Sequence, residues 1–385
     1  MNRQSKFTGL ILASGVRNGD PATIILEQLE AFSVIVLSSD LLFVRDRYIF
    51  TLLIEISPDH AQAISDELDL ITQGGEVDVA YEFTSFTAPE SESERRNSRY
   101  ECVIIGSDIR LAALSALQKL LTSYSSIDAF KLFNEHGYTV ARFTFSITEA
   151  EASEVLLKLR ELANSEALAI NLFSVSQHTT GNELVILDMD STFINEEVID
   201  EIAALAGVGS QVAAITESAM RGELDFAQSL MARTALLAGK PATLIDDARA
   251  RISLTRGAED LVRALHAKGA RVGIVSGGFH DVIDEFLAPL DLDFVVANSF
   301  EIEDGLFTGA ILGEIVDAKV KARTLLTSRG ESVRTIAIGD GANDIELLKA
   351  ADLGIAFCAK DALTAKANIS LNHRDLRAVL PLLGY

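Results

Sequence analysis

The sequence predicts an α/β protein in which two small βαββαβ units precede a larger, mostly parallel sheet with a helical insertion. Three observations carry this prediction. The order of strand and helix signals in residues 8–86 recurs in residues 102–175. From Gly181 onward, short apolar strands alternate with longer helices, which is typical of a parallel sheet. The first of these strands, 184–187, runs directly into Asp188 and Asp190.

Composition limits the classes of protein to consider. The 385 residues suffice for two or three domains of roughly 100–200 residues each. A net charge of -23 opposes binding to nucleic acid and to anionic membranes, so we expect neither partner. No apolar run reaches the roughly 20 residues of a membrane-spanning helix, and the start lacks the apolar stretch of a signal peptide. Cys102 and Cys358 stand in separate apolar stretches and are expected to be free thiols in a reducing cytoplasm.

The first unit, residues 1–86, has the βαββαβ order of a ferredoxin-like fold. Its helix that starts near 58 is marked by Ser57 as N-cap candidate and Pro58 in the first turn. The expected strands are 9–13, 32–37, 48–56 and 77–83, and the expected helices are 23–31 and about 58–71.

The second unit, residues 98–178, follows a polar, aperiodic stretch at 84–99 that we expect to be a linker. Phe145-Ser-Ile-Thr-Glu-Ala resembles Ile54-Glu-Ile-Ser-Pro-Asp, which indicates an internal duplication. Each unit buries one sheet face under its two helices, so we expect the other copy or a second chain to cover the other face. The expected strands are 102–106, 127–133, 138–147 and 167–175, and the expected helices are 111–121 and 149–163.

The paired units resemble ACT domains, small modules that bind amino acids at interfaces between copies. The resemblance implies ligand loops after the first strand of each unit, here residues 16–20 and 106–110. Neither loop repeats the Asp-x-x-Gly turn of that family, and a turn that satisfies its own backbone explains them equally well. ACT pairing also implies a homodimer.

The third domain, residues 181–385, carries the parallel sheet. After the acidic pair come helical segments at 196–206, 210–220, 225–237 and 242–251 without a strand between them. We expect this insertion, about 200–255, to form a cap over the site. The sheet resumes with a helix at 258–268, strands at 271–275 and 294–297, a hairpin around Asp304-Gly305, a helix at 318–328, strands at 335–338 and 353–357, and a closing helix from 375.

Polar residues follow several strands of this sheet, where open α/β sheets bind ligands. Ser276-Gly277-Gly278 offers hydroxyl and backbone donors to an oxyanion. Asp340, Asn343 and Asp344 supply the oxygen ligands that Mg²⁺ prefers, whereas an EF-hand calcium loop is absent. Lys319 and Lys321 at a helix start indicate an anion to be neutralised.

Together these residues predict phosphoryl transfer through an aspartyl-phosphate. One aspartate would attack phosphorus, and the second would protonate the leaving alkoxide and then activate water. Mg²⁺, lysine and serine would stabilise the developing charge.

These motifs resemble the four motifs of the haloacid dehalogenase superfamily and, within it, phosphoserine phosphatases over about residues 181–385. The resemblance implies the roles of nucleophile for Asp188 and acid/base for Asp190. It implies Mg²⁺ ligation by Asp188, the Asp190 backbone oxygen and Asp340, with Asp344 in support, and phosphate contacts from Ser276, Gly277 and Asn343. Lys321 fits the motif lysine better than Lys319, which stays the alternative. Met189 stands where phenylalanine is common.

The cap resembles the same family at three positions. Glu197 would pair with the substrate ammonium, Phe226 would exclude water, and Arg233 would hold the substrate carboxylate. Phe226 and Arg233 are seven residues apart and so share a helix face. The resemblance therefore implies hydrolysis of O-phospho-L-serine, the last step of serine biosynthesis, with L-serine as a candidate effector at the ACT-like units.

Two alternatives remain open. The chain could act on another small phospho-metabolite, although phosphosugars lack both charges that Glu197 and Arg233 would bind. It could also be an amino-acid-sensing regulatory protein with a vestigial catalytic half. The presence of every motif residue argues against this alternative.

Overall fold

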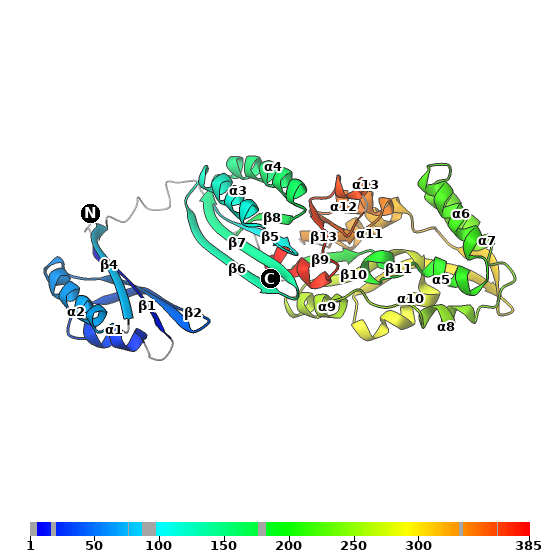
Figure 1. Cartoon of the computed structure of the whole chain (residues 1–385). Coiled ribbons are helices and arrows are strands. Elements are labelled where there is room, and N and C mark those ends of the chain that lie inside the picture. Colours follow the sequence, from blue (N-terminus) through cyan, green and yellow to red (C-terminus); the bar gives the residue numbers. More distant parts are fainter. Residues whose placement is uncertain are drawn as a thin grey trace. The chain divides into compact units, whose positions relative to one another are not determined.

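The computed structural model describes residues 6–16, 21–75, 77–86, 98–175, 182–330, 334–359 and 361–385. Contacts divide the chain into two compact units, Met1–Arg96 and Asn97–Tyr385, which are coloured along the sequence in Figure 1. Within the described ranges, no helix combines the length and apolar character needed to cross a membrane.

The first unit is a four-stranded antiparallel sheet of order β2-β3-β1-β4. The order of its elements confirms the predicted βαββαβ pattern, but β2 lies further along the chain than expected. Residues 38–40 are polar, yet β2 continues through them to Val44 because it pairs with β3 across a turn at Arg45, where φ is 55°. The elements are β1 Lys6–Val16, α1 Pro21–Leu29, β2 Ile35–Val44, β3 Arg47–Glu55, α2 Ala61–Gln73 and β4 Val77–Phe86.

The second small sheet repeats this arrangement in the order β6-β7-β5-β8. Strands β4 and β5 extend into both ends of the predicted linker, and its middle, 87–97, lies outside the described residues, as does most of the predicted ligand loop at 16–20. The elements are β5 Ser98–Gly106, α3 Leu111–Thr122, β6 Ile127–Glu135, β7 Tyr138–Ile147, α4 Glu149–Glu166 and β8 Ala169–Ser174.

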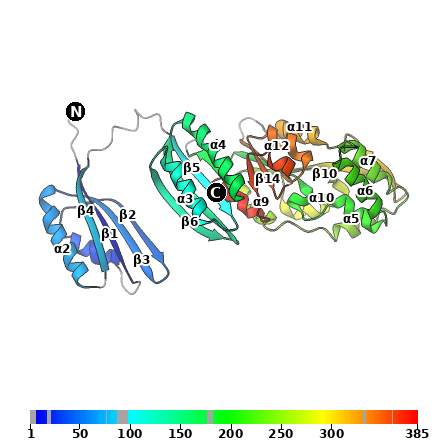
Figure 2. The same cartoon turned by 45° about the horizontal axis from the view of Figure 1, so that its top comes forward.

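The two faces of this second sheet have different neighbours. Helices α3 and α4 cover one face, as Figure 2 shows. On the other face, Val103 and Val140 belong to the same hydrophobic cluster as the large sheet, and Asn171 donates a 2.7 Å hydrogen bond to the carbonyl of Leu382. The expectation that another copy or a second chain covers this face was wrong, because apolar side chains of the C-terminal segment, such as Val379, pack there.

The large sheet has seven strands in the order β12-β11-β10-β9-β13-β14-β15. Its first strand in sequence, β9, is central, and its flanking strands β10 and β13 run parallel to it. The strands are β9 Glu183–Leu187, β10 Arg271–Phe279, β11 Phe294–Glu303, β12 Leu306–Leu312, β13 Arg334–Gly339, β14 Leu353–Phe357 and β15 Ile369–Leu371. The helices are α9 Ala258–Ala267, α10 His280–Leu287, α11 Ala318–Ser328, α12 Ile345–Ala350, α13 Asp361–Thr364 and α14 Val379–Leu382. Helices α10, α12 and α13 and the three-residue strand β15 were not predicted.

The insertion after β9 is helical, as expected. It contains α5 Val198–Leu205, α6 Gly209–Met220, α7 Phe226–Ala235 and α8 Leu244–Arg249. Figure 1 shows these helices gathered at the end of the large sheet that is remote from the second small sheet. We call this group the cap.

Candidate active site

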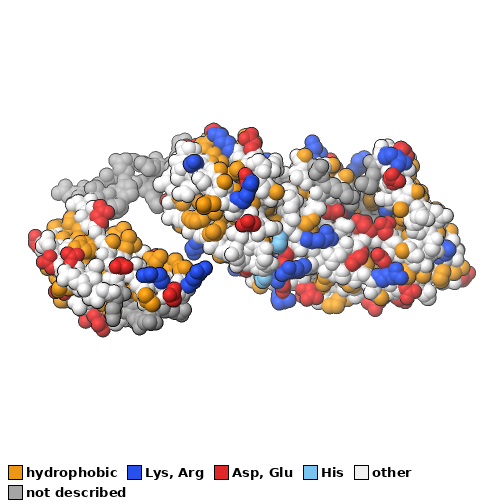
Figure 3. All heavy atoms as spheres, viewed as in Figure 1, with side chains coloured by type: hydrophobic (Ala, Val, Ile, Leu, Met, Phe, Trp, Pro, Cys, Tyr) orange, Lys and Arg blue, Asp and Glu red, His pale blue; other side chains and the backbone are white. Residues whose placement is uncertain are grey.

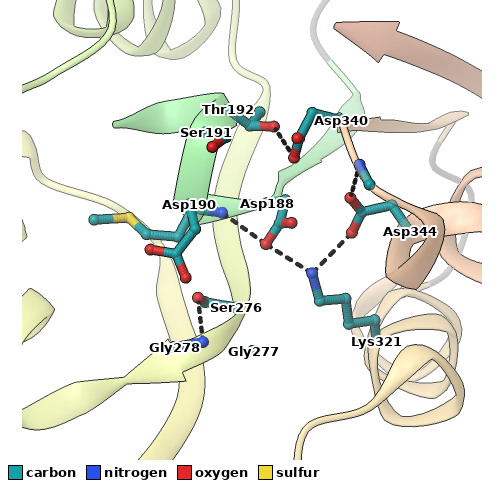
Figure 4. Close-up of polar contacts among 12 residues, drawn as sticks. Asp188, Asp190, Ser191, Thr192, Ser276, Gly277, Gly278, Lys321, Asp340 and Asp344 are labelled. Atoms are coloured by element: carbon teal, nitrogen blue, oxygen red, sulfur yellow. Dashed lines mark hydrogen bonds and ion pairs between the residues drawn. The ribbon is translucent and has the colours of Figure 1, made fainter. Parts of the chain in front are cut away.

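Asp188 lies at the carboxyl end of the central strand. Residues 184–187 before it have no solvent exposure, which fixes the strand between β10 and β13. The backbone N–H of Asp188 donates to the carbonyl of Ile338 at 2.9 Å, and its Oδ1 accepts a 2.8 Å hydrogen bond from Met189 (Figure 4). The chain adds strands first on one side of β9, with β10, and later on the other side, with β13. Open α/β sheets bind ligands at such a reversal of strand order, and Asp188 lies there.

Lys321 joins two buried carboxylates. Its Nζ lies 2.6 Å from Asp188 Oδ1 and 2.8 Å from Asp344 Oδ1, and none of the lysine is exposed. Asp317 caps helix α11 by accepting hydrogen bonds from two backbone N–H groups, which sets the helical phase that points Lys321 inward. Lys319 is exposed on the same helix. Burial opposes the charge on Lys321, but Asp188 and Asp344 raise its pKa above the ordinary lysine value.

Three carboxylates meet beside this lysine. Oxygens of Asp188, Asp340 and Asp344 lie within 4.8 Å of one another. Burial raises the pKa of Asp188, and the Asp344 carboxylate raises it further, whereas Lys321 opposes the shift. A single ammonium leaves this group with excess negative charge, and its donors are hard oxygens. The residues therefore fit a divalent cation such as Mg²⁺.

Two glycines and a threonine surround this carboxylate cluster. A Cβ on Gly339 would stand 2.5 Å from Asp344 Cγ, so the carboxylate packs where only glycine leaves room. Asp344 also accepts a 3.1 Å hydrogen bond from the Gly341 N–H. The Thr192 hydroxyl, which is fully buried, lies 3.3 Å from Asp340 Oδ1 and can donate to it.

Asp190 lies on the other side of the loop. Its Oδ1 accepts a 3.1 Å hydrogen bond from the N–H of Val198 at the start of the cap. Burial raises the pKa of Asp190 to about 8, with the Glu197 carboxylate as the second cause. A Cβ on Gly278 would lie 3.0 Å from Asp190 Oδ2, so the Ser276-Gly-Gly corner borders this carboxylate directly.

The Ser276 corner is held by hydrogen bonds and lies under the cap. Ser276 is fully buried, and its Oγ accepts a 2.8 Å hydrogen bond from Gly278. The side chain of Asn298 donates to the Gly277 carbonyl at 2.9 Å. A Cβ on Gly277 would lie 2.7 Å from the ring of Phe226, which places this cap side chain directly against the core corner.

The two predicted substrate-binding charges face the same region. Glu197 accepts a 2.9 Å hydrogen bond from the Ser191 hydroxyl. Burial lowers the pKa of Arg233, while the carboxylates of Asp200, Glu197 and Asp190 oppose that shift. Arg233 thus interacts electrostatically with all three acidic groups. Asn343 lies in the turn Ala342–Asp344 beside Gly341, at the edge of the carboxylate cluster.

Comparison with known proteins agrees with this geometry. A model of haloacid dehalogenase-like hydrolases matches residues 185–349, and a second model with the same description matches 321–382. "Phosphoserine phosphatase SerB2" of Mycobacterium tuberculosis is 36% identical over 99% of this chain and 94% of the relative. The chain belongs to the phosphoserine phosphatase family. The phosphoserine phosphatase of Streptomyces coelicolor is also 36% identical, over 94% of this chain and 88% of its own.

Solved structures show the same family fold. A HAD family hydrolase of Salmonella enterica serovar Typhi has a TM-score of 0.64 at 31% identity, covering 74% of this chain and 98% of its own. A phosphoserine phosphatase with bound substrate has a TM-score of 0.50 at 42% identity, covering 52% and 97%. A phospho-aspartyl intermediate analogue of a phosphoserine phosphatase matches equally well, over 52% and 98%.

Two residues of this candidate site were missed in the sequence. Thr192 was quoted only as part of the acidic motif, although its hydroxyl reaches Asp340. The second is Asp200: burial raises the pKa of its carboxyl, and the positive charge of Arg233 opposes that shift. Its position in the first turn of α5, three residues after the N-cap Glu197, was the available signal.

Proposed function

We propose that this chain is a Mg²⁺-dependent phosphatase that hydrolyses O-phospho-L-serine to L-serine and phosphate. The observation that carries the proposal is the buried Asp188–Lys321–Asp344 cluster at the end of the central strand, facing a cap that presents Glu197 and Arg233. Membership of the phosphoserine phosphatase family supports this substrate and the aspartyl-phosphate intermediate.

The first chemical step uses Asp188. Both of its contacts, to Lys321 and to Met189, engage Oδ1, so we assign Oδ2 to the attack on phosphorus. As the new O–P bond forms, the bond to the serine oxygen breaks, and Asp190 donates its proton to that oxygen. A pKa near 8 keeps Asp190 protonated at neutral pH in the free site.

The second step releases phosphate. Asp190, now ionised, takes a proton from water, which attacks the aspartyl-phosphate and regenerates Asp188. Ser276 and the Gly277 N–H are assigned to the phosphate oxygens, with Lys321 compensating their charge and Asn343 at the edge of the site. Mg²⁺ would be held by Asp188, the Asp190 carbonyl and Asp340 with Asp344 in support, and it would shield the repulsion between carboxylate and phosphate.

Substrate choice is assigned to the cap. We propose that Glu197 binds the ammonium and Arg233 the carboxylate of the amino acid, while Phe226 against Gly277 excludes water. The net charge of -23 opposes an anionic substrate, so local cations such as Arg233 and Lys321 are needed to bind it. Figure 3 shows acidic side chains gathered on the visible face of the large domain.

The test is phosphate release from L-phosphoserine with Mg²⁺, for the wild type and Asp188→Asn, with phosphothreonine and a phosphosugar alongside. Selective release that disappears in the variant supports the proposal. Equal or faster turnover of the phosphosugar would show that Glu197 and Arg233 do not form the clamp. No release from any substrate would favour the regulatory protein.

We also propose the domains 1–86, 98–178 and 181–385, together with cytoplasmic location, which the free thiols of Cys102 and Cys358 support.

L-serine is proposed as an effector at the ACT-like units. Deleting residues 1–96 tests this, because residues 97–385 form one compact unit with a shared core. Serine inhibition that is unchanged by this deletion would exclude the first ACT-like unit as its source.

A homodimer is proposed from the surface of the first unit. Every residue of edge strand β2 is exposed, including Ile35, Leu42 and Val44, each more than half exposed. An exposed apolar edge of this kind offers its unpaired backbone groups to a strand of another chain. Sedimentation of the wild type and Leu42→Asp tests this: a wild-type monomer would exclude the dimer.

A further inference from the structure

Two chain segments connect the cap to the large sheet, and they are paired with each other. The Asn195 N–H donates to the Ser253 carbonyl at 3.0 Å, and the Thr255 N–H donates to the Phe193 carbonyl at 2.9 Å. Ile194 and Leu254 form an antiparallel bridge between these two bonds. The two connections therefore form one short two-stranded hinge instead of two independent linkers.

Side chains fasten this hinge at Ser253. The Glu196 carboxylate accepts hydrogen bonds from the Ser253 N–H at 2.8 Å and from the Ser253 hydroxyl at 2.7 Å. The Asn195 amide donates to Ser253 Oγ at 3.0 Å and to the Leu254 carbonyl at 3.1 Å. We call the set Asn195, Glu196 and Ser253 the hinge clasp.

The clasp connects directly to the loop that carries Asp190. The backbone carbonyl of Glu196 accepts a 3.2 Å hydrogen bond from the Ser191 N–H. Ser191 is in the left-handed region with φ 55°, a conformation that costs free energy in a residue with a Cβ and persists only when its surroundings hold it. The next two residues along the hinge bind the same loop, since Glu197 accepts from the Ser191 hydroxyl and the Val198 N–H donates to Asp190.

We propose that Glu196 and Ser253 are positioning residues, which fasten the cap hinge and thereby hold the Asp190 carboxyl where it protonates the leaving serine oxygen. This inference rests on the proposed role of Asp190 as the acid. No residue of the clasp needs to touch the substrate.

Magnitudes separate this role from a structural one. Glu196 is half-buried and Ser253 is exposed, so their contribution to stability is small, because exposed polar contacts are weak. Displacing a catalytic group by about 1 Å can cost on the order of 100-fold in rate. Loss of the clasp should therefore affect proton transfer far more than folding.

The experiment compares Ser253→Thr with Ser253→Val, which have nearly the same shape and differ in the hydroxyl, together with Glu196→Ala. The matched control is Glu151→Ala, because Glu151 accepts 2.8 Å bonds from the N–H and hydroxyl of Thr148, the same chemistry, in the helix cap of α4. Single-turnover release of the leaving group is measured for the full chain with Mg²⁺, from O-phospho-L-serine and from p-nitrophenyl phosphate. The second leaves as a stable phenolate and needs little help from an acid.

We expect Ser253→Val and Glu196→Ala to slow serine release by about tenfold to 100-fold while p-nitrophenolate release stays close to wild type. Ser253→Thr and Glu151→Ala should release both as the wild type does. Equal slowing on both substrates, or none on phosphoserine, would overturn the proposal. A wild type that releases p-nitrophenolate but no serine would instead refute the proposed function. The variants would then be compared on glycerol phosphate and p-nitrophenyl phosphate in the same way.

Discussion

Replacing Lys321 by methionine tests the electrostatic balance of the buried cluster. Lys321→Met keeps the length and apolar stem of the side chain but removes the ammonium that contacts both Asp188 and Asp344. At a separation of 4.8 Å or less, two carboxylates repel by about 3.5 kcal/mol for an effective dielectric constant of about 20. Removing one partner of a buried ion pair typically costs about 3–5 kcal/mol, which agrees with this value.

The assay is urea unfolding at pH 7 in EDTA, followed by circular dichroism, with the loss expressed through the shift in midpoint. We expect Lys321→Met to lose about 3–5 kcal/mol and Lys319→Met, an exposed lysine on the same helix, to lose almost nothing. Lys321→Met combined with Asp344→Asn should recover a large part of the loss, because one of the two repelling charges is gone. A Lys321→Met variant as stable as the wild type, or a double variant no better than the single one, would refute this reasoning.

Three further predictions concern glycine, pH and the metal. Gly339→Ala should abolish most activity because its Cβ would displace Asp344, whereas Gly209→Ala, with its nearest contact at 3.5 Å, should be neutral; equal activity of both would contradict the packing argument. Burial would raise the pKa of Asp375, but hydrogen bonds from Arg377 hold it below the ordinary value, so its ionised form stabilises the fold above pH 4 and this stability is lost as acid protonates it. Asp375→Asn should thus lower the urea midpoint at pH 7 and flatten its decline in acid, and an unchanged decline would assign acid sensitivity elsewhere. Mg²⁺ at 100 times its dissociation constant should stabilise the wild type by about 2.7 kcal/mol and leave Asp340→Asn unaffected, as thermal scans with and without EDTA would show.

Local patterns in the sequence were sufficient for much of the fold. Continuous apolar runs that lead into Asp188, Ser276 and Asp340 identified the edge of the sheet where these residues meet, because parallel strands bring their carboxyl ends together. The choice between Lys319 and Lys321 depended on helical phase. Residues two apart on a helix point in nearly opposite directions, so the N-cap at Asp317 allows only one of them to face Asp188.

Long-range pairings were beyond the sequence. Nothing local to Val103 or Val140 indicates that residues near 380 will cover them, since any apolar segment could bury that face. The hinge clasp is similar, because Glu196 and Ser253 are ordinary surface residue types whose pairing depends on how the whole cap returns to the core. Strand β2 was shifted for a related reason, since its polar middle is extended only through hydrogen bonds to β3.

The position of β9 has a consequence for synthesis of the chain. Of the strands in the large sheet, the central strand β9 is made first. Strand β10 follows only after the cap, and β13 begins at Arg334. At about 5–20 residues per second, the roughly 150 residues between β9 and β13 take about 7–30 s to translate. Until β10 has been made, this apolar strand has neither permanent neighbour, and it lacks β13 for the whole interval. Non-local pairings of this kind form slowly. The nascent chain is therefore a natural client for chaperones until its last third has left the ribosome.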